Sequence, residues 1–323
     1  MKALGSLSVV LSVAALAAAA PVQSEIFGLS GGGFRIMRYD VVGNSFYDCG
    51  AVASGVLTTN LAMDANRRLY YMHPFEGGHV IWQADLDAGN NLINQQVHDT
   101  LGAGLSIIDG FTVGPDQQLY MTGYGHSEIY RYVIGSNSGA VTTEVTLGGG
   151  GAGGDLSEYR SDLAFDPITG YLVGIGIAPG GVRRTLFQIP GNLATNGVND
   201  SYPWEYFGGN ASPWASPTFD LGNPGNPNGP LGPNPDGVAF DPITGELFLS
   251  GDGELFSHWD RNTATVISYL NDPSGQDTGM GFDLAFQQTD GRETVPEPAT
   301  MALLGLGAFG VGRYVRRRGA GGR

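Results

Sequence analysis

Carboxylate and amide side chains recur along this chain, each at the start of a short apolar segment. Five residues hold this position in five related segments: Asn60, Asp109, Asp162, Asp236 and Asp283. If the segments lie side by side, the side-chain oxygens converge, and Ca²⁺ takes six to eight oxygen ligands of this kind. Asp and Asn also end loops by accepting hydrogen bonds from backbone N–H groups. We therefore expect a structural role for these residues, with a calcium or polar-ligand site as the alternative.

Aromatic side chains gather in a second region that could bind a ligand. Trp204 lies in the sequence Tyr-Pro-Trp-Glu-Tyr-Phe at residues 202–207, and Trp214 follows shortly after. Exposed indole rings could stack on sugar rings, whereas buried ones would pack the loop onto the body. No catalytic residue is predicted, and the sequence has no His-Glu-x-x-His motif. Its single cysteine, Cys49, is expected in a strand of the core.

An internal repeat supplies the elements that would position these residues. Two copies are nearly identical, Asp-Leu-Ala-Phe-Asp-Pro-Ile-Thr-Gly at 162–170 and Gly-Val-Ala-Phe-Asp-Pro-Ile-Thr-Gly at 237–245. Looser copies begin at residues 60 and 110, and a truncated fifth copy covers 283–287. Each full copy is typical of a strand, a tight turn and a second strand, because Pro fixes φ, Asp bonds to nearby N–H groups and Gly accepts positive φ. The aligned turn aspartates are Asp64, Asp116, Asp166 and Asp241.

The repeat predicts an all-β fold, a β-propeller. Alternating segments after most copies add a third and a fourth strand, and four antiparallel strands form one propeller blade. The fifth copy supplies only an inner strand at 283–286, whereas the region from 26 to about 46 supplies strands without an inner one. Combining these N- and C-terminal strands closes a ring of five blades and removes open sheet edges. Six blades are the alternative, if the long interval between Asp166 and Asp241 contains another blade, and a β-sandwich comes third.

The inner strands predict how neighbouring blades pack. Large side chains share one face of each inner strand, as in Leu163 and Phe165, and a small residue occupies the other face. The small residues are Ala62, Thr112, Ala164, Ala239 and Ala285. We expect each small residue to pack against large side chains of an adjacent blade.

The charge of the chain excludes one class of partner. There are 16 basic and 31 acidic residues, a net charge of −15. Six of the bases, Lys2 and five arginines within 313–323, lie outside the repeated body, and without them and Glu297 the net charge is −20. Such a body is repelled by nucleic-acid phosphates and anionic lipid. Cations or neutral polysaccharides are easier partners, and no nucleic acid is expected.

The N-terminus has the pattern of an export signal. Lys2 precedes a nearly unbroken apolar stretch from residue 3 to residue 20, and small residues follow. This order is typical of a secretory signal peptide, which we expect over residues 1–24. An uncleaved N-terminal membrane anchor is the alternative.

The C-terminus combines a short proline motif, an apolar segment and a basic cluster. The apolar segment, residues 299–315, has 17 residues and would form a helix of about 25 Å, the short limit for spanning a bilayer. Arginines at its end would stay on the cytoplasmic side and leave the body outside. The residues of the motif and of the cluster are Pro296, Glu297, Pro298, Arg313, Arg316, Arg317 and Arg318.

This tail resembles the PEP-CTERM sorting signal of Gram-negative bacteria. The resemblance implies export across the inner membrane and recognition by an exosortase-type membrane transpeptidase. It also implies a place at the cell surface or in the extracellular polysaccharide matrix, with a transient or retained C-terminal membrane anchor. The repeated body resembles, in a general way, secreted six-bladed propellers of the lactonase-like and NHL-like groups.

These observations lead to one expected organisation and two functional hypotheses. We expect a signal peptide at 1–24, a β-propeller at 25–294 and a sorting or membrane segment at 295–323. The first hypothesis is a surface or matrix component that binds or supports other molecules, with polysaccharide as one partner, and that is not an enzyme. The alternative is a metal-dependent hydrolase of the lactonase type, with Asp109, Asp162, Asp236 and Asp283 as metal ligands.

Overall fold

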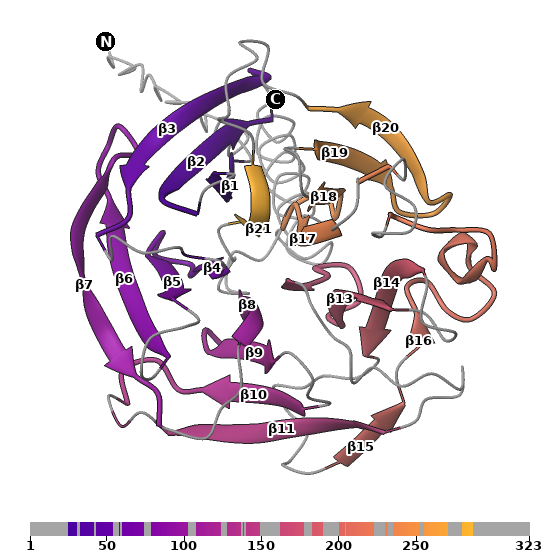
Figure 1. Ribbon diagram of the computed structural model, residues 1–323, viewed down its shortest axis with the longest axis horizontal. Coiled ribbons are helices and arrows are strands. Elements are labelled where there is room, and N and C mark those ends of the chain that lie inside the picture. Colours follow the sequence, from indigo (N-terminus) through magenta and orange to yellow (C-terminus); the bar gives the residue numbers. More distant parts are fainter. Residues whose placement is uncertain are drawn as a thin grey trace, which may run out of the picture.

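Five sheets surround a central channel in the computed structural model, and all their strand pairs are antiparallel except one at the edge of a single sheet (Figure 1). The structure describes residues 25–30, 33–41, 43–53, 58, 60–73, 79–102, 108–123, 128–136, 138, 140–148, 162–177, 183–189, 200–203, 205–222, 230–231, 235–251, 255–270 and 280–286. The segments expected as signal peptide and sorting helix lie outside these residues. The expected five-bladed propeller is confirmed.

Each blade has its first strand at the channel and its last strand at the rim (Figure 1). One blade consists of β4 (Asn60–Met63), β5 (Leu69–His73), β6 (Val80–Leu86) and β7 (Leu92–Thr100). The next has β8 (Ile108–Val113), β9 (Leu119–Gly123), β10 (Glu128–Tyr132) and β11 (Val141–Gly148). The third has β12 (Leu163–Phe165), β13 (Leu172–Ile177), β14 (Arg184–Ile189) and β16 (Glu205–Tyr206). The fourth has β17 (Pro235–Phe240), β18 (Leu247–Gly251), β19 (Leu255–Asp260) and β20 (Thr265–Tyr269).

The fifth blade, which we call the closing blade, joins the two ends of the body. Its strands are β21 (Met280–Phe286), β1 (Glu25–Ser30), β2 (Arg35–Asp40) and β3 (Ser45–Ala51), in this order from channel to rim. In the β1–β21 pair, Ile26 lies opposite Phe286 and Phe27 opposite Ala285. The C-terminal strand therefore occupies the inner position that the N-terminal sequence lacks, as the truncated repeat predicted.

The core is divided among the junctions between blades. Ala62 of β4 shares a buried cluster with Phe111 and Val113 of β8. Ala164 likewise lies with Val238 and Phe240. Ala239 shares a cluster with Leu284 and Phe286, and Ala285 with Leu61 and Met63, which completes the circle. The expected packing of small against large side chains is confirmed at these four junctions, and it leaves the inner strands room to approach one another.

The long interval between the third and fourth blades holds additional elements and no sixth blade among its described residues. β15 (Asp200–Pro203) pairs in parallel with the rim strand β11, which gives that blade a fifth strand. β16 is a short rim strand on β14. The 3₁₀ helix η1 (Pro213–Ala215) then places Trp214 in the core cluster between the third and fourth blades.

In the turns after the inner strands, the aspartate side chains and the glycine have the roles that the sequence predicted. Oδ1 of Asp166 accepts a hydrogen bond from the N–H of Ile168 at 3.0 Å, and Oδ1 of Asp241 accepts one from the N–H of Ile243 at 2.8 Å. Gly170, which ends the Asp166 turn, has a φ of 72°. We call the end of the propeller with these turns the turn face, and the opposite end, where the inner strands begin, the entry face.

One looser copy of the repeat differs from the alignment made on sequence. The N–H of Gly114 donates to the carbonyl of Gln118, and the N–H of Asp64 donates in the same way to the carbonyl of Arg68. Gly114 thus takes the place of Asp64, and Asp116 lies two residues further on. There its carboxylate binds Arg131, with an Nη2–Oδ2 distance of 2.7 Å. The turn in this blade is one residue shorter than the Asp-Pro-Ile-Thr-Gly turns, which the sequence alignment did not take into account.

A buried ion pair links the third and fourth blades at the turn face. Asp166 is fully buried, and its carboxylate accepts two hydrogen bonds from Arg261, at 3.0 and 2.6 Å. Burial alone would raise the pKa of Asp166, but the hydrogen bonds from Arg261, Thr169 and the backbone of Ile168 outweigh it and lower the pKa below its ordinary value. The pair stabilises the fold only while the carboxylate is ionised.

Replacing the carboxylate should therefore change the acid stability of the protein. We expect Asp166→Asn to lower the free energy of unfolding at pH 7 by about 3 kcal/mol. This is the lower end for breaking a buried pair, because Arg261 keeps 19% of its surface exposed. Since the folded-state pKa lies below that of the unfolded chain, about 3.9, the contribution is complete above about pH 5 and is lost as pH falls through the folded-state value. Denaturant unfolding from pH 3 to 7 should show the two proteins converging at low pH, and a constant difference would contradict this role.

Candidate functional site

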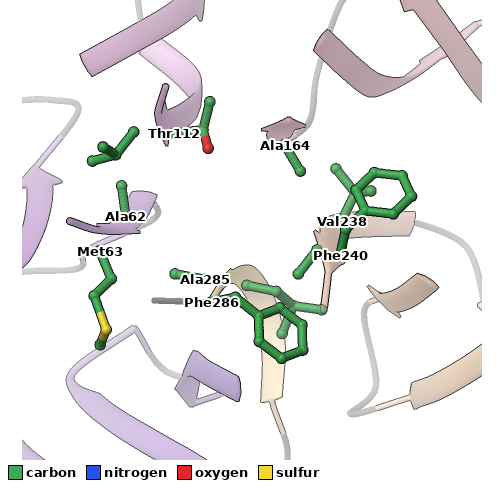
Figure 2. Close-up of a pocket in the computed structure, with 11 residues that line it drawn as sticks. Ala62, Met63, Thr112, Ala164, Val238, Phe240, Ala285 and Phe286 are labelled. Carbon is green, nitrogen blue, oxygen red and sulfur yellow. The ribbon is translucent and has the colours of Figure 1, made fainter. Parts of the chain in front are cut away.

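The inner strands of the five blades surround a central channel. All five inner strands line a narrow cavity of about 10 Å³, roughly the space that one water molecule needs. Figure 2 shows small side chains, such as Ala62, Ala164 and Ala285, and larger ones, such as Met63 and Phe286, arranged around it. The hydroxyl of Thr112 is the one side-chain polar group among the residues that line this cavity. This end of the channel is therefore filled mainly by packed side chains, because the remaining space holds about one water molecule.

The backbone places the predicted entry residues at the start of the inner strands. Asn60 is the first residue of β4, Asp109 and Asp236 are the second residues of β8 and β17, and Asp283 lies within β21. Asp162 directly precedes β12. The structure describes the side chains of Asn60 and Asp162, whereas those of the other three lie outside the described part. The calcium hypothesis for the full set therefore stays a prediction.

Asp162 ties three inner strands together. Its side chain has no exposed surface. Oδ2 accepts hydrogen bonds from the N–H groups of Val238 at 3.1 Å and Leu284 at 3.0 Å, while Oδ1 accepts one from Leu163 at 2.8 Å. The three donors belong to β12, β17 and β21. Backbone N–H groups at the channel edge need acceptors when they are buried, and this carboxylate supplies them, which is the structural role expected from the residue type.

Asn60 also links two inner strands, but as a hydrogen-bond donor, whereas Asp162 is an acceptor. It is fully buried, and its Nδ2 donates to the carbonyl of Ile108 at 3.1 Å, so it joins β4 to the next inner strand, β8. The two described entry side chains thus hold neighbouring blades together. A Ca²⁺ ion at this position would have to share the oxygens of Asp162 with three backbone donors. No group of three or more His, Cys, Asp or Glu residues suited to a metal ion occurs among the described side chains.

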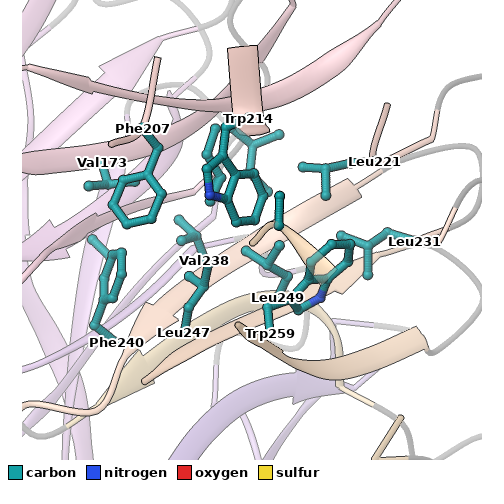
Figure 3. Close-up of a cluster of buried hydrophobic side chains, with 14 residues drawn as sticks. Val173, Phe207, Trp214, Leu221, Leu231, Val238, Phe240, Leu247, Leu249 and Trp259 are labelled. Carbon is teal, nitrogen blue, oxygen red and sulfur yellow. The ribbon is translucent and has the colours of Figure 1, made fainter. Parts of the chain in front are cut away.

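Trp214 lies in the core and not on an accessible face. It has no exposed surface, and its indole packs against Trp259 and Phe207, with ring centroids 5.7 Å apart in both pairs (Figure 3). Phe219 adds a third ring, with its centroid 5.0 Å away. Its Nε1 donates to the carbonyl of Arg261 at 2.9 Å. The stacking platform expected from Trp214 is therefore not formed by this residue, because the rings that surround it exclude a sugar. Trp204 lies outside the described residues.

Arg184 is a residue near the entry face that the sequence did not single out. It is buried, and its Nη1 donates to the carbonyl of Pro235 at 3.3 Å, next to Asp236 in β17. Its backbone N–H donates to Oδ1 of Asp220 at 3.0 Å. A guanidinium at this position reduces the negative potential at the channel entry. The contact crosses from one blade to the next, so a strand-by-strand reading of the sequence could not have found it.

The geometry and the C-terminal sequence together define an exported β-propeller protein. Residues 294–318 match the family model described as the PEP-CTERM protein-sorting motif. This motif is the signal for an exosortase partner and directs an exported protein to the cell envelope. The resemblance of the tail to this signal is thus confirmed. In the part of the chain that the structure describes, no helix is long and apolar enough to cross a membrane.

Solved structures with related shapes are similar to this chain only at a general level. A protein of unknown function from Bacteroides thetaiotaomicron has 14% identity and a TM-score of 0.48, with 84% of this chain and 66% of that one covered. A protein described as a "putative gluconolactonase" has 11% identity and a TM-score of 0.41, with 70% and 67% covered. A protein from Lactobacillus plantarum has 17% identity and a TM-score of 0.37, with 77% and 66% covered. The chain thus spans about two thirds of each structure's length, and no curated protein matches it.

The structural role of Asp162 can be measured directly. Asp162→Asn replaces one acceptor oxygen with an NH₂ group and removes the negative charge, so buried N–H groups lose their partners. We expect the free energy of unfolding to fall by about 2–4 kcal/mol, since hydrogen bonds to charged groups are the strong class and an unsatisfied buried donor costs 1–3 kcal/mol. Asp87→Asn, at an exposed turn, is the control and should have a much smaller effect. Equal effects of the two changes in denaturant unfolding would disprove the role of Asp162.

Proposed function

We propose that this protein is a non-catalytic component of the cell surface or extracellular matrix, whose propeller binds or supports polysaccharide. The observation that carries the proposal is the combination of a closed ring with an envelope-sorting motif. A ring with cyclic packing is a rigid platform for loops, and its placement at the envelope brings those loops to surface polymers. In this proposal residues 1–24 are removed as a signal peptide, and residues 295–323 serve as the sorting and membrane segment of the propeller at 25–294.

The charge of the body supports a neutral polymer as the ligand. Arg184 and Asp162 form contacts between blades. The other acidic residues of the inner strands on the entry side are Asp109, Asp236 and Asp283. An acidic surface disfavours anionic polymers at low ionic strength. Neutral sugars bind by hydrogen bonds and by stacking on aromatic rings, for which Trp204 remains the candidate.

Binding can be tested with matrix polysaccharide from the organism that makes the protein. The unmodified protein should be retained on the immobilised polymer. Trp204→Ala should reduce retention at least several-fold, because it removes the ring, whereas Trp204→Phe should keep most of it. An unmodified protein that passes through as freely as a size-matched acidic control would refute polysaccharide binding.

A metal-dependent hydrolase of the lactonase type is the second candidate. It is favoured by the hydrogen bonds of Asp162, which bring the starts of β17 and β21, with Asp236 and Asp283, close to β12. Together with Asp109 these residues would supply the carboxylates for Ca²⁺, which would polarise an ester carbonyl.

Calcium removal separates the two candidates. A protein with a calcium site is stabilised by RT ln(1 + [Ca²⁺]/Kd), so its melting temperature should fall in a chelator and recover when Ca²⁺ is added. The proposed non-catalytic protein should show no shift. The control is Mg²⁺ at equal concentration, which should not restore the melting temperature, because it requires a tighter octahedral site. A reversible shift specific to Ca²⁺ would favour the hydrolase and call for a lactone-hydrolysis assay.

A further inference from the structure

Both ends of the described body leave the propeller at the turn face. β21 ends at Phe286, which pairs with Ile26 near the start of β1. Phe286 holds the place in its inner strand that Phe240 holds directly before the Asp241 turn. The sorting motif begins at residue 294. The apolar segment at 299–315 is therefore connected to the propeller from this face.

The connection to the apolar segment is short relative to the body. Residues 287–298 separate the two parts, and this length of chain spans at most about 40 Å when fully extended. As a flexible coil it would span about 20 Å on average. A compact domain of roughly 270 residues has a radius of gyration of about 18 Å, so its width exceeds the average span of this connection. Turning the entry face toward the membrane would require the connection to run extended around the rim.

The turn face carries two of the most exposed apolar side chains of the described body. Ile168 is 63% exposed and Ile243 is 60% exposed, at the same position of the Asp-Pro-Ile-Thr-Gly turns in neighbouring blades. A Cβ added to Gly245 would collide with the side chain of Ile168, so this side chain lies against the turn that carries Ile243. The two isoleucines therefore lie on adjoining turns at the junction between the third and fourth blades, and we call them the apolar patch.

Several charges of the turn face are paired, whereas Glu246, directly after Gly245, has a side chain that is 47% exposed and lies 3.7 Å from His258. Arg261 binds Asp166 at 2.6 Å, and Arg131 binds Asp116 at 2.7 Å. In the first blade, two blades away from the patch, Arg68 contacts Asp85 at 3.0 Å. Pairing reduces the repulsion and desolvation that bare carboxylates would meet at a lipid surface. Acidic groups in the outer turns, such as Asp87 and Asp260, are placed further toward the rim.

We propose that the turn face lies against the membrane that holds residues 299–315, with Ile168 and Ile243 in contact with lipid and the entry face directed away. Side chains of this type partition to the apolar side of the membrane interface. The proposal depends on the sorting motif and the position of β21, and not on polysaccharide or calcium binding. The acidic body makes zwitterionic lipid the favoured surface.

The proposal can be tested with the full-length chain in zwitterionic phosphatidylcholine vesicles that contain lipid spin-labelled near the headgroup. Single variants Ile168→Cys, Ile243→Cys and Phe34→Cys are labelled with a thiol-reactive fluorophore. Phe34, 49% exposed in the loop between β1 and β2 at the entry face, is the matched control. Cys49 is buried, and desolvation raises the pKa of its thiol to about 12, so the unmodified chain should not be labelled at pH 7.

We expect quenching by the spin label to be at least threefold stronger at positions 168 and 243 than at position 34. Quenching at either position that is no stronger than at position 34 would overturn the proposal, as would a chain that fails to float with the vesicles. Thermal unfolding checks that each variant is folded, and Thr244→Cys on the same turn replaces a variant that is not. Vesicles with anionic lipid should reduce the quenching at 168 and 243, because the acidic body is repelled.

Discussion

The pairing of β1 with β21 is the interaction on which the rest of the architecture depends. The other four blades are built from strands within the body of the chain, with β15 as the one strand that joins the sheet of another blade, and they can form their hydrogen bonds without the chain ends. The closing blade cannot, because its inner strand comes from the opposite end of the body. This strand lies between β17 and β4, and its Leu284, Ala285 and Phe286 contribute to two of the five core clusters. Without it, the first and fourth blades would each expose an apolar face, and the channel would be open on one side.

Much of this fold could be predicted because the repeat encodes local and periodic features. The Asp-Pro-Ile-Thr-Gly turns fix their own geometry, and the alternation of large and small residues identifies the faces of each inner strand. Contacts that cross from one blade to another were not predictable in this way. The pairing of Arg261 with Asp166, the position of Arg184 and the parallel addition of β15 depend on how the blades meet in space. The position of Asp116 was also not predictable, because Gly114 takes the place of the turn aspartate and Asp116 follows two residues later.

The repeat allowed the positions of the entry residues along the strands to be predicted, but not the hydrogen bonds that their side chains form. Four of the entry residues lie at or directly before the starts of the inner strands, since a strand repeat preserves such positions, and Asp283 lies in the middle of β21. Their chemistry depends on bonds that sequence does not show, and Asp162 uses both oxygens to hold backbone groups of three blades. Trp214 illustrates a related difficulty, because an aromatic residue in a Pro-rich and Gly-rich loop has the same sequence whether the loop is exposed or packed. Here the loop folds back, and the indole fills the junction between the third and fourth blades.

The distance along the chain between the two strands of the closing pair also has a consequence for the order of events during export. Ile26 and Phe286 meet across nearly the whole length of the body, and contacts of such high sequence separation form slowly. A chain that crosses a membrane from its N-terminus cannot complete the ring until β21 has emerged. The first three strands must therefore wait, with one apolar edge uncovered, until the last part of the body arrives. The sorting motif follows directly behind, so completion of the fold and presentation of the motif occur at the same stage of translocation.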